Sequence, residues 1–244
     1  MRNARGRRGG GVPLVAPPTA IFANVAQWIV SSAGITYGTP PAISGWTDQG
    51  PNGNTPVQGT AAQRPSLVSG FVDFDGTDDS LVSADNGSLD FVTSFTIGVA
   101  CRFDTLGTIQ VVASKGAASA DNAWSLQMDT TNLRMLIDGI TNLGYVTPAA
   151  AGTWGRYIFR YDGGGVGNAQ RLRAWKNGVE GITHTGTIPA SITNGATQDV
   201  RFGRWAGSVF QYLDGAISSY VSTGIAGTDA QILALDRYLA TTHP

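Results

Sequence analysis

The amino-acid sequence predicts an all-β protein: a two-sheet antiparallel β-sandwich with an extended N-terminal arm and a short C-terminal helix. The main observation is a series of about ten short segments in which apolar and polar residues alternate, the period of a half-buried strand. The second is composition, because 33 of the 244 residues are Gly and only 14% are charged. That composition suits many short strands joined by tight turns. A sandwich of this length is expected to be one domain.

Residues 1–20 are predicted to form a basic arm, and residues 21–244 the sandwich. Three prolines fix φ and remove N–H donors, so the end of the arm should be extended: Pro13, Pro17 and Pro18. Four arginines lie within the first eight residues: Arg2, Arg5, Arg7 and Arg8. The rest of the chain is more acidic than basic. This asymmetry predicts attachment to an acidic protein surface or nucleic acid, and a solvated terminus is the alternative.

After the arm, residues 25–30 are predicted as a strand, with a short amphipathic helix over 21–31 as the alternative. A long loop dense in Gly, Pro, Asn and Thr follows from 31 to 64. A loop of this length usually packs through its own aromatic residues or serves a function. Strands are then predicted over 71–74, 95–103, 109–114, 123–129, 133–137, 155–161, 170–176, 200–204 and 214–222. Asn177 and Gly178 predict a type I′ hairpin turn, because both positions must tolerate positive φ.

A helix is predicted to close the chain, from Asp229 to Ala240. Thr228 can cap its N-terminus, and the acidic Asp229 suits the first turn. Ile232, Leu235 and Leu239 fall on one face.

A set of short motifs follows one another along the chain: Trp46 to Asn54, Arg64-Pro65, Val72 to Leu81, Ser94 to Ile97, Ser114-Lys115-Gly116, Gly152-Thr153-Trp154, Trp175 to Val179, Asp214 to Ile217 and Asp229 to Ala240. In this order they resemble the laminin-G-like branch of the concanavalin A-like lectin/glucanase superfamily. The resemblance covers roughly residues 21–244 and implies a jelly-roll sandwich. It is closest in kind to the domains found in phage structural proteins and bacterial surface proteins.

The resemblance implies two functions. The first is a non-enzymatic virion structural protein of a phage, such as a head-decoration, head-fibre or tail-associated subunit anchored by the N-terminal arm to other virion proteins. Such a protein would be assembled in the host cytoplasm, lie on the particle surface and form a homo-oligomer, by analogy a trimer. The alternative is a carbohydrate-binding or adhesion module of a bacterial surface protein, and an outward face that binds host glycans would combine the two.

The inventory of catalytic residues argues against an enzyme. Glycanases of the superfamily place two Glu around an Asp on one strand, since one acid protonates the leaving oxygen and another attacks or activates water. Glu180 is the sole Glu of this chain, and it follows the Asn177–Gly178 turn. His184 and His243 are the two histidines, and no nucleophile motif accompanies them. The sequence therefore predicts neither catalysis nor an organic cofactor.

Calcium is a possible ligand, because it prefers several carboxylate, amide and carbonyl oxygens. The candidate ligands are Asp48, Asn52, Asp78 and Asp79. The alternative is that the aspartates of this region, such as Asp75 and Asp78, hydrogen-bond their own turn, as Asp commonly does before Gly and Thr.

Glycan binding is predicted through aromatic residues in or near loops, because sugars stack on aromatic faces. The candidates are Trp46, Tyr145, Trp205 and Tyr212, and core packing is the alternative for each. No segment has the roughly 18 uninterrupted apolar residues of a membrane span, so no membrane partner is expected.

Overall fold

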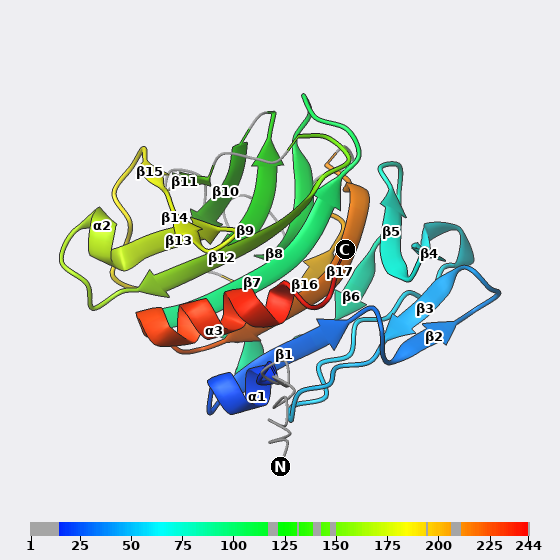
Figure 1. The fold of residues 1–244 in the computed structure, drawn as a ribbon, viewed down its shortest axis with the longest axis horizontal. Coiled ribbons are helices and arrows are strands. Elements are labelled where there is room, and N and C mark those ends of the chain that lie inside the picture. The colour runs from blue at the N-terminus through cyan, green and yellow to red at the C-terminus, as the bar shows by residue number, and fades with distance from the viewer. Residues whose placement is uncertain are drawn as a thin grey trace, which may run out of the picture.

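The computed structural model describes residues 15–116, 122–130, 132–138, 143–146, 150–193, 195–205 and 211–243. Two antiparallel sheets pack face to face, and a helix lies against the outer face of one of them (Figure 1). The predicted all-β sandwich with a C-terminal helix is confirmed.

The larger sheet has eight strands. Its path runs β14-β13-β12-β7-β17-β5-β4, and β1 also pairs with β17. The bounds are β1 Val25–Val30, β4 Ser66–Val68, β5 Phe71–Asp75, β7 Ser94–Phe103, β12 Trp154–Asp162, β13 Leu172–Lys176, β14 Val179–Glu180 and β17 Asp214–Thr223. The turn between β13 and β14 is the predicted hairpin, with φ of 50° at Asn177 and 79° at Gly178.

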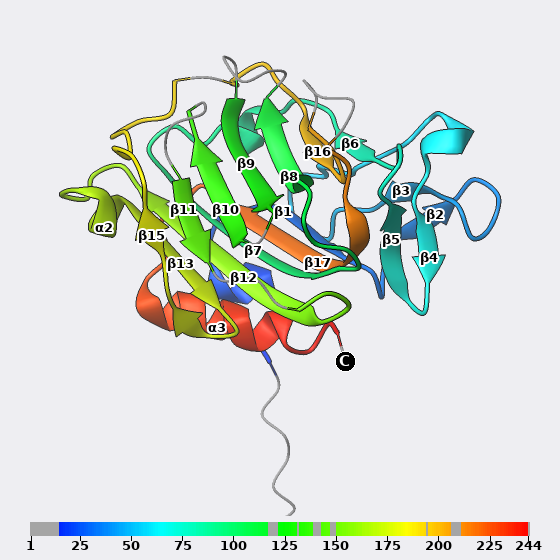
Figure 2. The same ribbon diagram turned by 90° about the horizontal axis from the view of Figure 1, so that it is seen from above.

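The second sheet has seven strands in the order β15-β11-β10-β9-β8-β16-β6. Figure 2 looks onto this sheet, with β8 to β11 side by side across it. The bounds are β6 Leu81–Ser83, β8 Gln110–Gly116, β9 Asn122–Asp129, β10 Asn132–Ile137, β11 Leu143–Val146, β15 Thr183–His184 and β16 Val200–Phe202.

Three segments differ from the sequence-based expectations. The predicted loop over 31–64 contains a two-stranded hairpin, β2 Ile35–Tyr37 and β3 Ile43–Trp46, and the short 3-10 helix η1 Ala61–Gln63. Pro18–Ile21 forms the short helix α1, because a proline is well tolerated in the first turn. The predicted strand 170–176 begins as the helical turn α2, Asn168–Arg171.

The main core lies between the two sheets. Alternate residues of β7, from Phe95 through Ile97 and Val99 to Phe103, point into it, and Trp124 of β9 faces them from the other sheet. Full burial of side chains of this size stabilises the fold by about 1.5–3 kcal/mol each. The apolar residues of the alternating segments, from which the strands were predicted, are therefore the residues that form this core.

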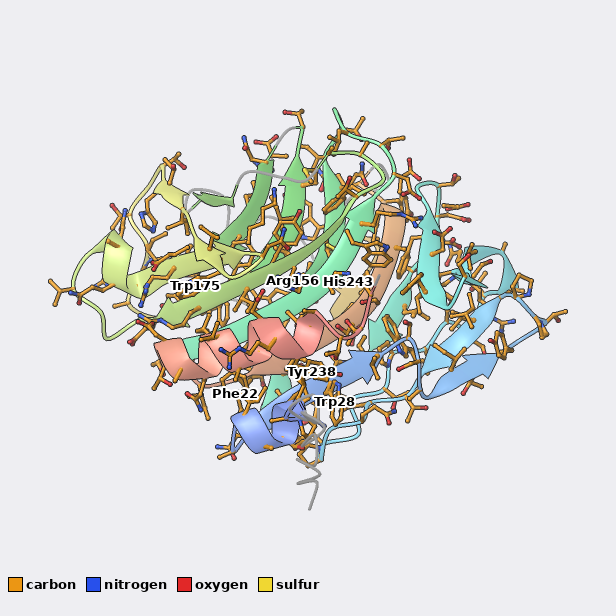
Figure 3. The ribbon with its side chains drawn as sticks, viewed as in Figure 1. Phe22, Trp28, Arg156, Trp175, Tyr238 and His243 are labelled. Carbon is orange, nitrogen blue, oxygen red and sulfur yellow. The ribbon has the colours of Figure 1, made fainter. Side chains whose placement is uncertain are left out.

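Helix α3, Asp229–Leu239, packs against the outer face of the eight-stranded sheet. It begins with a capping box between Thr228 and Gln231, in which two backbone donors are satisfied. A Cβ at Gly98 of β7 would lie 2.7 Å from Leu235 Cδ2, so the helix sits close on the strand. Figure 3 shows Tyr238 directed toward Trp28 of β1, whose indole N–H donates to the tyrosine hydroxyl at 2.6 Å.

Candidate functional site

The outer face of the seven-stranded sheet carries polar side chains. In β9 the residues Trp124, Leu126 and Met128 point into the core, so Ser125 and Gln127 point to the opposite side. The register pairs Ser125 with Ser114 of β8, and Gln127 with Arg134 of β10. We call Ser114, Ser125, Gln127, Arg134 and Arg201 of β16 the polar sheet face.

Hydrogen bonds fix the side chains at the centre of this face. Gln127 Nε2 donates to Ser125 Oγ at 2.8 Å, and Arg134 Nη2 donates to Gln127 Oε1 at 3.0 Å. Arg134 Nη1 also pairs with Asp129 Oδ2 at 3.2 Å. Ser125 and Gln127 are buried, which limits their freedom to rearrange. These contacts hold the Arg134 guanidinium, whose side chain is 14% exposed, in place before any ligand arrives, and this reduces the entropy cost of binding.

The loop after β16 runs beside the polar sheet face. Ser114 Oγ donates to the carbonyl of Arg204 at 3.2 Å, and the Arg204 guanidinium lies 5.8 Å from the centre of the Tyr212 ring. Trp205, the next residue, is partly exposed. The Arg204 guanidinium and the Tyr212 ring thus lie together at the side of the sheet where β8 and β16 lie, and Trp205 follows Arg204 in the chain.

Several buried polar atoms here lack a hydrogen-bond partner in the part of the chain that the structure describes. They are Arg134 Nε, Arg204 Nε, Trp205 Nε1 and Gln211 Oε1. A buried polar group without a partner costs free energy. Three of the four are donors, so among these unpartnered atoms donors outnumber acceptors.

The four predicted glycan-binding aromatics separate into two groups. Trp205 and Tyr212 lie beside the polar sheet face, and the backbone of Tyr145 in β11 pairs with Arg134 of β10. Trp46 does not belong to this region. It is fully buried in the main core, and its indole N–H donates to the carbonyl of Val30 at 2.9 Å.

The prediction for Trp46 is therefore wrong. An aromatic residue must expose a ring face to stack on a sugar, and the side chain of Trp46 is 0% exposed among the residues of the main core. The sequence-based search also missed Ser125, Gln127 and Arg134. The sequence pattern could have identified them, because they are the polar residues of the alternating segments 123–129 and 133–137.

A separate cleft of about 370 Å³ opens between the start of β1 and the 3-10 helix η2, Gly87–Leu89. Its polar lining includes Asn24, Asn52, Ser88 and Asp90. Asp90 also borders a neighbouring hollow of about 130 Å³. There the buried ammonium of Lys115 lies 3.0 Å from Asp90 Oδ1 and 2.8 Å from Asp85 Oδ1, which compensates its charge.

The four predicted calcium ligands do not form one set. The Asp48 carboxylate accepts backbone N–H groups from Trp28, Gly50 and Asn54, each at 2.8 Å. Asn52 Nδ2 donates to the carbonyl of Val25 at 2.7 Å. Asp48 and Asn52 therefore hold their own loop against β1, and the prediction that they join Asp78 and Asp79 is wrong.

Asp78 and Asp79 come together instead with Asp75, and their carboxylate oxygens lie within 4.8 Å of one another. Asp75 Oδ1 accepts from Thr77 N at 2.8 Å, and Asp79 Oδ2 accepts from Asp75 N at 3.1 Å. Burial, with Asp75 as the nearest like charge, raises the pKa of Asp79 to about 7. The alternative interpretation, a turn held by its own aspartates, accounts for these contacts.

Most of the predicted attachment arm lies outside the described residues, including Arg2, Arg5, Arg7, Arg8 and Pro13. Pro17 has the extended conformation expected of it, whereas Pro18 begins α1. Attachment through the arginines stays a prediction. Among the described helices, none is long and apolar enough to cross a membrane.

Comparisons with known proteins match the fold. No protein-family model and no curated protein sequence matches the chain. Among solved structures, Trypanosoma rangeli sialidase in complex with sialic acid is similar, with a TM-score of 0.60 and 12% identity over 88% of this chain and 33% of that one. Domain 4 of AbnA, a GH43 extracellular arabinanase from Geobacillus stearothermophilus, in complex with arabinotriose, gives a TM-score of 0.56 and 15% identity over 87% of this chain and 98% of that one. The chain spans about a third of the sialidase.

These likenesses establish the sandwich fold, and they contradict the expectation that the chain is not an enzyme. The similar structures belong to a sialidase and an arabinanase. The expectation rested on the missing strand with two Glu around an Asp. The absence of this one pattern does not exclude catalysis by other residues. The conclusion that the chain is non-enzymatic is withdrawn.

Proposed function

We propose that the chain is a carbohydrate-binding module whose ligand lies across the polar sheet face. The observation that carries this proposal is the partly exposed guanidinium of Arg134, held by the buried Gln127. At the other side of the same face the Arg204 guanidinium lies over the Tyr212 ring, and the partly exposed Trp205 follows in sequence. A sugar has apolar C–H faces and a rim of hydroxyls, so it suits a surface that offers aromatic rings and fixed guanidinium groups.

The architecture of the similar structures supports this function. The arabinanase domain is matched over nearly its whole length and is in complex with arabinotriose, and the sialidase is in complex with sialic acid. Both proteins act on glycans. The fold alone does not decide function, so the proposal depends on the residues of the polar sheet face.

Titration calorimetry with arabinotriose and a panel of neutral and charged oligosaccharides tests the proposal. Trp205→Ala should weaken binding of the best ligand about tenfold, the order of an aromatic contact of 1–1.5 kcal/mol. Tyr37→Ala is the matched control, because Tyr37 is 41% exposed and lies in the β2–β3 hairpin. The proposal fails if the wild-type protein binds nothing in the panel, or if the two variants bind equally well.

A virion role is the second candidate. It is favoured by the four arginines within the first eight residues and by the order of motifs that resembles phage laminin-G-like domains. In this version the arm attaches the module to other virion proteins, and the polar sheet face is available to glycans of the host surface.

A further inference from the structure

We infer that the oligosaccharide bound at the polar sheet face carries carboxylate groups. This inference rests on the proposed function and adds the chemical class of the ligand. Its basis is three guanidinium groups at one face, those of Arg134, Arg201 and Arg204, for which the described residues supply two carboxylate partners, Asp129 and Asp199.

The strand register places the three arginines at two separate positions. Arg201 of β16 pairs with Ser114 of β8, and Ser114 pairs with Ser125 of β9. Arg134 lies on β10, beyond β9. Three strand spacings separate β16 from β10, roughly 14 Å, and neutral side chains lie between them. Arg204 shares the position of Arg201, because its carbonyl accepts from Ser114.

The charge balance differs between the two positions. Arg134 pairs with Asp129 and also donates to Gln127. Arg201 pairs with Asp199 at 3.2 Å. Arg204 has no carboxylate within 4.0 Å in the part of the chain that the structure describes, and its guanidinium packs over Tyr212 instead. Arg204 is therefore the guanidinium at this position that has no carboxylate partner among the described residues.

Burial supports the same conclusion. Burial lowers the pKa of Arg201, Asp199 opposes this shift, and the nearby Arg204 adds to it. The Nε atoms of Arg134 and Arg204 are buried without an acceptor among the described residues. An anionic group at the exposed ends of these guanidiniums would offset the excess charge, and carboxylate is the anion that a planar guanidinium binds in bidentate fashion.

The rest of the molecule favours a glycan over a nucleic acid. The formal net charge is −1 and the isoelectric point is about 6.1, whereas nucleic-acid-binding domains are usually basic overall. The charges here are discrete and separated by Ser and Gln, beside Trp205 and Tyr212. That spacing matches a sugar chain with carboxylates on some of its units better than a continuous line of phosphates.

The test begins with a glycan array that contains uronate-bearing, sialylated and neutral oligosaccharides. Carboxylated glycans should dominate the bound set, and binding should weaken as salt is raised to 0.5 M because exposed charges are screened. The best carboxylated ligand is then compared with its methyl ester, which keeps the sugar skeleton and removes the charge. The ester should bind about tenfold more weakly, the order of one charge-assisted hydrogen bond.

Arg204→Gln should remove most of the difference in binding affinity between the acid and its methyl ester. Arg237→Gln should leave that difference unchanged. Arg237 is the control because it is exposed on α3, on the opposite side of the sandwich. The inference is overturned if neutral glycans dominate, or if acid and ester bind equally at low salt; either outcome leaves the proposed function intact. Absence of binding to every glycan overturns both.

Discussion

Arg156 of β12 and Asp236 of α3 form a bidentate ion pair, in which Arg156 Nε lies 2.8 Å from Asp236 Oδ1 and Arg156 Nη2 lies 3.3 Å from Asp236 Oδ2. Both side chains are largely buried, 19% and 11% exposed, and Figure 3 places Arg156 next to the helix. The pair is one of several polar links between α3 and the sheet beneath it, together with Arg173–Asp229 and Trp28–Tyr238. It complements the apolar contacts of Ile232 and Leu235.

Asp236→Ala is expected to lower the free energy of unfolding by about 2 kcal/mol, because it leaves the Arg156 guanidinium without its partner in a mostly buried position. Urea denaturation followed by tryptophan fluorescence measures this change. Arg237→Ala, one residue further along the helix and exposed, should cost less than about 0.5 kcal/mol. Equal effects of the two substitutions would show that the ion pair contributes nothing specific.

Asp48→Asn should destabilise the loop from 48 to 54. Its carboxylate accepts three backbone N–H groups, and an amide would set its own donors against at least one of them. The expected loss is about 2 kcal/mol. Asp162→Asn is the control, because Asp162 accepts one N–H in an exposed position, from Gly164. A comparable loss in both variants in urea denaturation would contradict this role of Asp48.

Asp79→Asn should stabilise the protein above pH 7. Burial raises the pKa of Asp79 to about 7 in the folded protein, from the 3.8 that is ordinary for an aspartate, so the folded state favours the protonated form. Its contribution to stability is complete below pH 4 and is lost as pH rises through 7. Asn imitates the protonated acid and can still accept from Asp75 N. The variant should therefore be about 1–2 kcal/mol more stable at pH 8, after allowance for solvent screening.

Urea midpoints of both proteins between pH 4 and pH 8 measure this effect. The gain should shrink toward zero at pH 4. A difference that stays constant over the range would show that the carboxylate charge is not its cause.

Removal of residues 1–18 should abolish binding to particles that lack this subunit, if the chain is a virion protein attached through its arm. A full-length variant with Gln in place of Arg2, Arg5, Arg7 and Arg8 separates charge from length, and its binding should also fall because an acidic partner would lose its counter-charges. Co-sedimentation with the particles measures both. Undiminished binding of the truncated protein would exclude the arm as the anchor.

Local pattern was sufficient for most of the fold. The alternation of Phe95 to Phe103 and the Asn177–Gly178 turn each encode their structure within a few residues. The burial of Trp46 could not be predicted in this way, because it depends on the pairing of β3 with β2 and on the carbonyl of Val30. The same limit applies to Lys115, which reads as a surface residue but is 1% exposed between two aspartates distant in sequence.

For the candidate site, aromatic residues near loops pointed to Trp205 and Tyr212, but the search gave little weight to polar residues within strands. Gln127 and Arg134 become significant only when the order of β8, β9 and β10 is known, since that order makes them neighbours. Sheet order is set by long-range pairing, which alternation along one strand does not reveal.

Because α3 lies on one side of the sandwich only, the two broad surfaces of the molecule differ. The helix occupies the outer surface of one sheet, so that of the two broad surfaces the one formed by β8 to β11 is the one that no described helix covers (Figure 2). A fluorophore, biotin or resin linkage at Leu233, 47% exposed on the helix, would thus orient every molecule on a sensor with its polar sheet face toward the solution.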